Sequence, residues 1–168
     1  MKWKFLFWAL PVILSSCQHE TQTNVPGSYV PESVRLASDV MTPEVLWSFG
    51  RLGEATVSPD GRLTAYTVTY FQIEEDKPYR DIYLFDHDKN ETMRITDTPE
   101  NEFNIQWRPD GKKIGYLSSK SGSVQVWEMN PDGTGNQQIS EIEGGISGFT
   151  YSPDMQHIAY IQSVKLDK

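Results

Sequence analysis

The strongest constraint on the fold of this chain is a four-residue turn sequence that occurs three times. Ser-Pro-Asp-Gly at 58–61 is followed 50 residues later by Arg-Pro-Asp-Gly at 108–111 and, after 44 more residues, by Ser-Pro-Asp-Met at 152–155. Recurrence at such a period is typical of architectures in which one supersecondary unit is copied and stacked. The sequence therefore predicts a repeat protein.

The residues around each copy predict two antiparallel strands joined by a tight turn. Proline presets φ, aspartate bonds nearby backbone, and glycine accepts a positive φ. Mostly apolar side chains stand two and four residues before each proline, and a tyrosine stands seven residues after it (Tyr66, Tyr116 and Tyr160). This period of two indicates strands, and the tyrosines are expected in the core or between units. Met155 replaces glycine in the third copy, so we expect a looser turn there.

Two complete units and part of a third follow from this pattern. Strands are expected at 54–58, 63–70, 81–85 and 93–96, then at 103–108, 113–118, 124–129 and 137–140, and a third unit begins at Gly148. Four short strands joined by turns make up one β-propeller blade. The predicted fold is all-β, an incomplete β-propeller of about two and a half four-stranded antiparallel blades (54–97, 103–141 and 148–168). Because propellers close with roughly four to eight blades, we expect a fragment.

The start of the chain has the layout of a secretory leader. Residues 1–16 carry Lys2 and Lys4, an apolar run over 5–14 and two serines before Cys17. The run is too short for a permanent membrane span. Residues 14–17 (LSSC) also resemble the lipobox of bacterial lipoproteins, which implies a signal peptide over 1–16 and lipid attachment at Cys17. The alternatives are an ordinary buried cysteine and an uncleaved anchor.

A tether and a short helix are expected between the leader and the blades. Residues 17–40 are polar, contain prolines and glycine, and predict a flexible tether. Over 41–53, Thr42-Pro43-Glu44 is a helix start, with threonine as the cap and proline at the first helical position. Val45, Leu46 and Phe49 give this helix an apolar face, and Gly50 or Gly53 can end it.

Composition excludes several classes of function. The formal charge is −8, and removal of the two leader lysines makes it more negative. An acidic chain is a poor partner for nucleic acid and anionic lipid surfaces. The single cysteine allows neither an intrachain disulfide nor a cysteine-based metal cluster. No cofactor is expected.

Three short segments before and within the first repeat carry a family resemblance: 41–47 (MTPEVLW), 50–53 (GRLG) and 57–61 (VSPDG). Together they look like the start of the propeller of prolyl oligopeptidase family serine peptidases, in the dipeptidyl-peptidase and acylaminoacyl-peptidase branch. In that family an α/β-hydrolase domain downstream of the propeller carries the catalytic triad. The resemblance implies a non-catalytic, N-terminal propeller segment of a secreted, lipid-anchored serine peptidase, with peptide substrates only for the full-length parent. It places that parent in the bacterial cell envelope, facing the periplasm or exterior. The repeats are also similar to those of TolB, which implies the alternative of a periplasmic protein-binding module.

No catalytic or metal site is predicted within the chain. The nearest approach to a nucleophile elbow is GISGF at 145–149, which lacks the final glycine and precedes a strand, so we expect a link between blades. His87 between Asp86 and Asp88, and the loop 132–136, could suggest metal sites. Without further ligands at suitable spacing, both are interpreted as solvated turns.

The best local candidates for substrate binding are Glu74 and Glu75. They lie in an insertion, roughly 71–80, expected as a loop between the second and third strands of the first blade. The resemblance implies a role, because dipeptidyl peptidases pair propeller acids with the free amino terminus of the substrate, and carboxylates suit an ammonium group. The alternative is that these acids are merely solvated.

Overall fold

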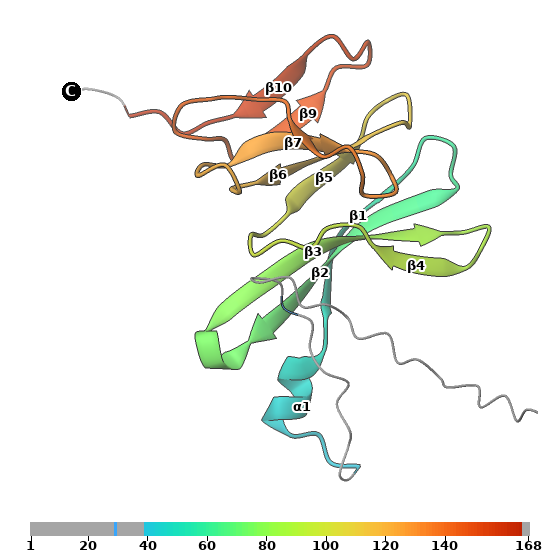
Figure 1. Ribbon diagram of the computed structural model, residues 1–168, viewed down its shortest axis with the longest axis vertical. Helices are drawn as coiled ribbons and strands as arrows, with labels where there is room; N and C mark the ends of the chain where they lie inside the picture. Colours follow the sequence, from blue (N-terminus) through green and yellow to red (C-terminus); the bar gives the residue numbers. More distant parts are fainter. Residues whose placement is uncertain (1–28, 30–38, 166–168) are drawn as a thin grey trace, which may run out of the picture.

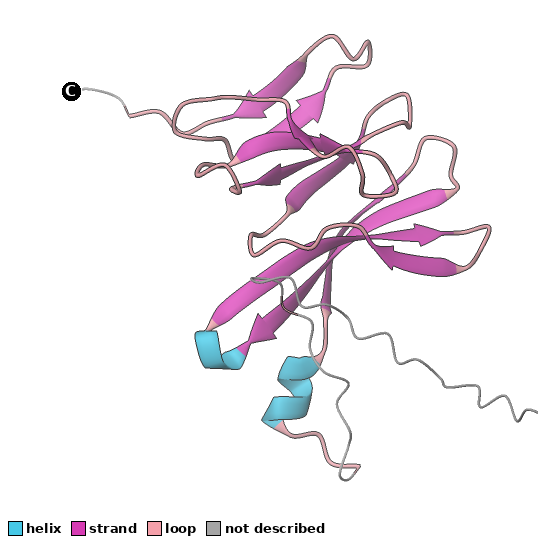
Figure 2. Cartoon of the chain, in the orientation of Figure 1, coloured by secondary structure: helices cyan, strands magenta, loops and turns pink. Residues whose placement is uncertain are grey.

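The structure is a computed structural model that describes Tyr29 and residues 39–165. It is all-β with one short α-helix, as the sequence predicts (Figures 1 and 2). Two four-stranded antiparallel sheets are followed by a two-stranded one, and the strand order in each four-stranded sheet is the order in sequence. The first sheet contains β1 (Arg51–Val57), β2 (Leu63–Gln72), β3 (Lys77–Asp86) and β4 (Glu91–Arg94). The second contains β5 (Phe103–Trp107), β6 (Ile114–Ser118), β7 (Gln125–Met129) and β8 (Gln137–Gln138), and the third contains β9 (Gly148–Tyr151) and β10 (Ile158–Ile161). We call these sheets blades 1, 2 and 3.

The insertion expected as a loop over 71–80 is instead the end of a long hairpin. β2 and β3 pair without interruption from Leu63 opposite Asp86 to Gln72 opposite Lys77. Only a short 3-10 helix, η1 (Ile73–Glu75), and Asp76 separate the two strands. The loop prediction was wrong because threonine and aromatic residues continue the strand pattern into this segment. Blade 1 therefore carries a hairpin whose tip projects beyond the rest of its sheet (Figure 1).

Helix α1 (Pro43–Ser48) begins as predicted and ends directly before Gly50, one of the two glycines expected to end it. The Thr42 side chain accepts a hydrogen bond from the Val45 N–H (3.4 Å), and Pro43 occupies the first turn. Phe49 is the C-terminal cap in extended conformation. The expectation that Gly53 could end the helix was wrong, because Gly53 lies within β1, which begins at Arg51 rather than at residue 54.

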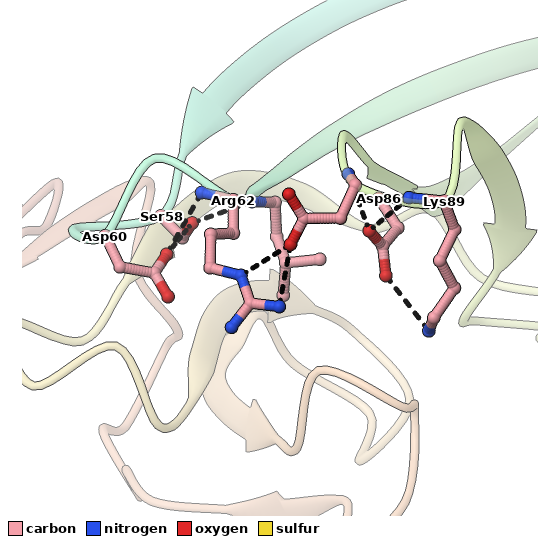
Figure 3. A network of polar contacts seen from close by, with 7 residues as sticks. Ser58, Asp60, Arg62, Asp86 and Lys89 are labelled. Carbon is pink, nitrogen blue, oxygen red and sulfur yellow. Dashed lines mark hydrogen bonds and ion pairs between the residues drawn. The ribbon is translucent and has the colours of Figure 1, made fainter.

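The repeated turns share one hydrogen-bonding scheme, and Figure 3 shows its first copy. In the first copy, Ser58 Oγ donates to Asp60 Oδ1 (2.6 Å) and accepts from the Leu63 N–H (2.9 Å), while Asp60 Oδ1 accepts from the Arg62 N–H (3.1 Å). In the second copy, Arg108 takes the place of the serine. Its guanidinium makes two 2.9 Å bonds to Asp110 and lowers the pKa of that carboxyl to about 2.

The third copy keeps this geometry although it lacks glycine. Met155 has a φ of 59°, and its N–H bonds the Ser152 carbonyl at 2.9 Å. The corresponding bonds of Gly61 and Gly111 are 2.9 and 2.8 Å. The expectation of a looser turn was therefore wrong. Asp154 Oδ1 accepts from Ser152 Oγ and from the Gln156 N–H, so the side chains hold the turn in the left-handed conformation.

Apolar side chains between successive blades form the core. The cluster between blades 1 and 2 includes Ala65, Ile82, Ile105, Trp107 and Tyr116, and that between blades 2 and 3 includes Leu117, Val126, Ile146 and Phe149. Tyr116 is fully buried, which confirms the packing role expected for it. The outer faces have no neighbouring blade within the described residues, so Leu52 in blade 1 is 77% exposed and Ile161 in blade 3 is 67% exposed. Tyr160 lies opposite Phe149, on the face toward blade 2, and is nevertheless 49% exposed, so the packing role expected for it was wrong.

A side chain on the first strand of each complete blade also holds the backbone of the next blade. Glu54 and Asn104 both stand five residues before the proline of their repeat. Glu54 Oε2 accepts from the Ile105 N–H (3.0 Å), and Asn104 Oδ1 accepts from the Phe149 N–H (2.8 Å). Both donors stand four residues before their own proline. The same contact therefore recurs at both joints, and we call it the inter-blade bond.

Removal of the inter-blade bond is expected to destabilise the joint between blades 2 and 3. Asn104 has a φ of 51°, so Asn104→Gly deletes the acceptor without backbone strain. It leaves the Phe149 N–H, on a buried residue, without this acceptor, and a loss of about 1–3 kcal/mol in the free energy of unfolding is expected. Asn104→Asp keeps an acceptor and should lose much less. Urea unfolding measures both, and equal losses would contradict the assignment.

Met155→Gly is expected to stabilise the protein. Glycine removes the cost of a left-handed backbone, about 1 kcal/mol, and Met155 is 45% exposed, so little packing is lost. Gln156→Gly is the matched control, since residue 156 has no positive φ and glycine should only add flexibility to the unfolded chain. The midpoint of thermal unfolding should rise for the first variant and fall for the second. A fall for both would mean that the turn is not strained.

Candidate functional site

The two acids singled out in the sequence lie on η1, at the tip of the β2–β3 hairpin. Both are exposed. Glu75 Oε2 accepts a hydrogen bond from the Tyr79 hydroxyl (2.8 Å), and this bond raises the pKa of Tyr79. Burial raises the pKa of Tyr29, with a further contribution from the negative charge of Glu74. The Tyr29 and Tyr79 rings lie 5.7 Å apart. Two adjacent carboxylates and two tyrosines thus share the hairpin tip.

This arrangement suits the binding of a cationic group. The hairpin ladder fixes the position of η1, and Asp76 turns the chain with a φ of 49°. Glu75 is partly committed to Tyr79, whereas no hydrogen bond or ion pair of Glu74 occurs among the described residues. Exposed carboxylates on a rigid turn can accept hydrogen bonds from an ammonium group. Sequence reasoning found these acids but not the paired strands that position them.

The turn residues considered as metal ligands are engaged with one another or with neighbours. A His87 ring nitrogen lies 2.8 Å from Thr64 Oγ1, Asp86 pairs with Lys89 (3.0 Å), and Asp88 pairs with Arg62 (2.7 Å). In the loop 132–136, Asp132 accepts from the Thr134 N–H and hydroxyl. Within residues 39–165 and Tyr29, no group of three or more His, Cys, Asp or Glu is placed to hold a metal ion.

Ser147 lies in the link between blades 2 and 3. Its hydroxyl donates to the Ile161 carbonyl (3.4 Å), and the strand β9 follows immediately. A nucleophile elbow requires a helix after the serine. The structure therefore gives Ser147 a position in a strand-to-strand connection.

A buried acid that sequence reasoning missed lies between blades 1 and 2. Glu102 is fully buried, accepts from Thr98 Oγ1 (2.6 Å), and donates its N–H to the Arg80 carbonyl (3.1 Å). Burial raises its pKa to about 7. Solvent does not reach this carboxyl, and its Oε1 also accepts from the Ser118 hydroxyl of β6 (3.4 Å). Its position just before β5 gives no sequence signal for such burial.

The cavity between blades 2 and 3, about 480 Å³ in volume, has no uncommitted charge of its own. Arg108 pairs with Asp110 (2.9 Å) and with Glu128 (3.5 Å). The Tyr151 hydroxyl donates to Glu128 (2.8 Å). The charged groups of the lining therefore satisfy one another.

The predicted lipid site, Cys17, lies outside the described residues, as do the whole of the leader over 1–16 and most of the tether over 17–40. In the described part of the chain, no helix is long and apolar enough to cross a membrane.

Comparisons with known proteins connect this fold with peptidases. No protein-family model matches the sequence. Two proteins named dipeptidyl-peptidase 5 are similar to this chain. That of Porphyromonas gingivalis is 38% identical over 142 residues, which cover 84% of this chain and 21% of the relative. That of Porphyromonas endodontalis is 33% identical over 129 residues, which cover 77% of this chain and 19% of the relative. The chain thus spans about a fifth of the length of these curated relatives.

Solved structures agree in fold. An acylaminoacyl peptidase from Pyrococcus horikoshii has a TM-score of 0.57 and 17% identity, over 68% of this chain and 17% of that one. TolB from Acinetobacter baumannii has a TM-score of 0.52 and 22% identity, over 65% of this chain and 26% of that one. At such identities these structures support the fold only. Homologues named dipeptidyl-peptidase 5 cover most of this chain, which is a β-propeller segment similar to part of those peptidases.

Proposed function

We propose that this chain is the non-catalytic N-terminal propeller segment of a secreted serine peptidase of the dipeptidyl- or acylaminoacyl-peptidase type. The observation that carries the proposal is 38% identity to a dipeptidyl-peptidase 5 across 84% of the chain. Since the chain spans about a fifth of that relative, the hydrolase domain and its catalytic residues would lie in a part of the protein outside these 168 residues. The propeller would position peptide substrates for that domain.

Within this role, Glu74 and Glu75 bind the free amino terminus of the peptide. The two carboxylates sit together on the exposed turn η1. Charge-assisted hydrogen bonds to an ammonium group are worth roughly 1.5–3 kcal/mol each. Loss of such a contact would act on substrate binding rather than on bond cleavage.

Replacement of both acids by alanine is expected to raise KM for substrates with a free amino terminus. The protein is purified at its natural length, and release of a chromogenic leaving group from a dipeptidyl substrate is measured. KM should rise about tenfold or more, with kcat changed much less. For a substrate with an acetylated amino terminus, KM should be the same for the wild type and the variant.

The matched control changes two other exposed acids, Glu91→Ala and Glu141→Ala, and should leave KM unchanged. Unchanged KM in the Glu74 and Glu75 variant would remove these residues from the site. Absence of any serine-reagent-sensitive peptide hydrolysis by the natural-length protein would overturn the peptidase proposal itself.

The same proposal places the protein in the bacterial cell envelope, anchored through lipid on Cys17 and facing the periplasm or exterior. A basic start, a short apolar run and small residues before the cysteine support this. Metabolic labelling with a radioactive fatty acid should label the wild-type protein, and Cys17→Ser should lose the label. A wild-type protein that stays unlabelled contradicts the anchor.

A second candidate is a TolB-like periplasmic propeller that binds proteins. The structural similarity to TolB favours it, although it supports the fold alone. The gene sequence beyond Lys168 separates the two: a Gly-x-Ser-x-Gly motif followed by aspartate and histidine supports the peptidase. A propeller that closes and ends there supports the binding protein.

A further inference from the structure

A cavity of about 350 Å³ lies on blade 1, at the base of the long hairpin. Its walls come from three adjacent strands and include Arg51 and Glu54 of β1, Thr67, Thr69 and Phe71 of β2, and Arg80 of β3. Its volume lies within the range of small-ligand sites. Neither Glu74 nor Glu75 lines this cavity.

The strand register brings the two arginines together. Arg51 pairs with Thr69 across β1 and β2, and Thr69 pairs with Arg80 across β2 and β3. Residues directly opposite on neighbouring strands project from the same face of a sheet. Arg51, Thr69 and Arg80 therefore form one row across three strands, with an arginine on either side of the threonine.

Both guanidinium groups are held in place. The Arg51 guanidinium carbon lies 4.4 Å from the Trp47 ring centre and 4.5 Å from the Phe71 ring centre. Contacts of this kind attract a cation to the faces of the rings. Arg80 Nε donates to Thr69 Oγ1 (3.1 Å). These contacts orient the arginines without neutralising their charges.

The two arginines differ from the other arginines that the structure describes. Arg62, Arg94 and Arg108 each form an ion pair with an aspartate at 2.7–2.9 Å. Within the described residues, no ion pair is formed by Arg51 or Arg80. The protein has a formal charge of −8, so acidic partners are abundant. Both arginines without an ion pair nevertheless line the same cavity.

One acid also lines the cavity, and it is already engaged. Glu54 Oε2 accepts from the Ile105 N–H (3.0 Å), the inter-blade bond to blade 2. With two arginines against one glutamate, the cavity has a net positive formal charge. An anion is therefore the ligand that this site favours.

We propose that the cavity binds a peptide carboxylate through Arg51 and Arg80. Guanidinium groups match the planar carboxylate and bind it through paired hydrogen bonds. The volume exceeds the needs of an inorganic ion, and Phe71 supplies an apolar wall for the organic part of the ligand. The choice of a peptide rests on the proposed peptidase function. The preference for an anion rests on the cavity alone.

The test is calorimetric titration of the natural-length protein with three peptide-like probes and inorganic phosphate. Acetyl-Phe with a free carboxylate and acetyl-Phe amide differ only in the terminal charge, and acetyl-Glu amide presents a side-chain carboxylate. At least one of the two carboxylates should bind at least tenfold more tightly than acetyl-Phe amide. The stronger of the two identifies a terminal or a side-chain carboxylate as the ligand. Equal binding of phosphate and carboxylates would overturn the peptide assignment.

Variants assign the binding to the two arginines. The double variant Arg51→Gln and Arg80→Gln should weaken carboxylate binding at least tenfold, whereas Arg62→Gln, an exposed arginine of the same blade, should not change it. If the double variant does not fold, Thr69→Val removes the hydroxyl that orients Arg80 at nearly constant shape and should weaken binding severalfold. The proposal is overturned if the variant that folds binds the carboxylate as tightly as the wild-type protein does. It is also overturned if the wild-type protein binds neither carboxylate at millimolar concentration.

This assay is independent of hydrolysis. Carboxylate binding without peptide cleavage would leave the site standing and remove the peptidase function. Peptide cleavage without carboxylate binding would remove the proposed site and leave the peptidase function standing.

Discussion

The structure depends on the way in which each blade holds the next one. A single blade is a small sheet with two faces, and it buries its apolar side chains only when another blade covers them. The apolar clusters between blades supply most of this burial. The inter-blade bonds from Glu54 to the Ile105 N–H and from Asn104 to the Phe149 N–H also align neighbouring blades. Each bond joins the first strand of one blade to the first strand of the next and so limits sliding between them. In the third repeat the corresponding residue is Gly148, which has no side chain for such a bond.

The repeats and the blades could be predicted from the sequence because their signals are local. The turn residues act within five positions of one another, and the alternation of apolar residues is read within a single strand. Even the exception at Met155 is local, and it was misjudged because the hydrogen bonds of Ser152 and Asp154 compensate for the missing glycine. The length of the hairpin was missed because the acidic residues Glu74, Glu75 and Asp76 suggest a longer solvated loop, whereas only residues 73–76 lie outside the pairing of β2 with β3.

The inter-blade bond and the arginine cavity could not be predicted in the same way. Glu54 and Asn104 are equivalent in position but differ in charge, so no residue type repeats. Arg51 and Arg80 are separated by nearly thirty residues and meet only through the register of three strands. Glu102 is a charged residue in a connection, where exposure is the usual expectation, and yet it is fully buried. Each of these features depends on long-range pairing rather than on local pattern.

The two ends of blade 1 differ in how their charged groups are paired. Antiparallel order places the 58–61 turn and the 87–90 turn at one end of the sheet, and places the tip η1, the start of β1 and helix α1 at the other (Figure 1). At the first end, the charged groups Asp60, Arg62, Asp86, Asp88 and Lys89 bond one another or nearby backbone. At the second end, Glu74, Arg51 and Arg80 have no ion pair within the described residues. Charges that satisfy one another stabilise a scaffold, whereas oriented charges without partners are available to a ligand. Under the proposed function, the end that carries α1 and the hairpin tip is the end at which the peptide would be bound.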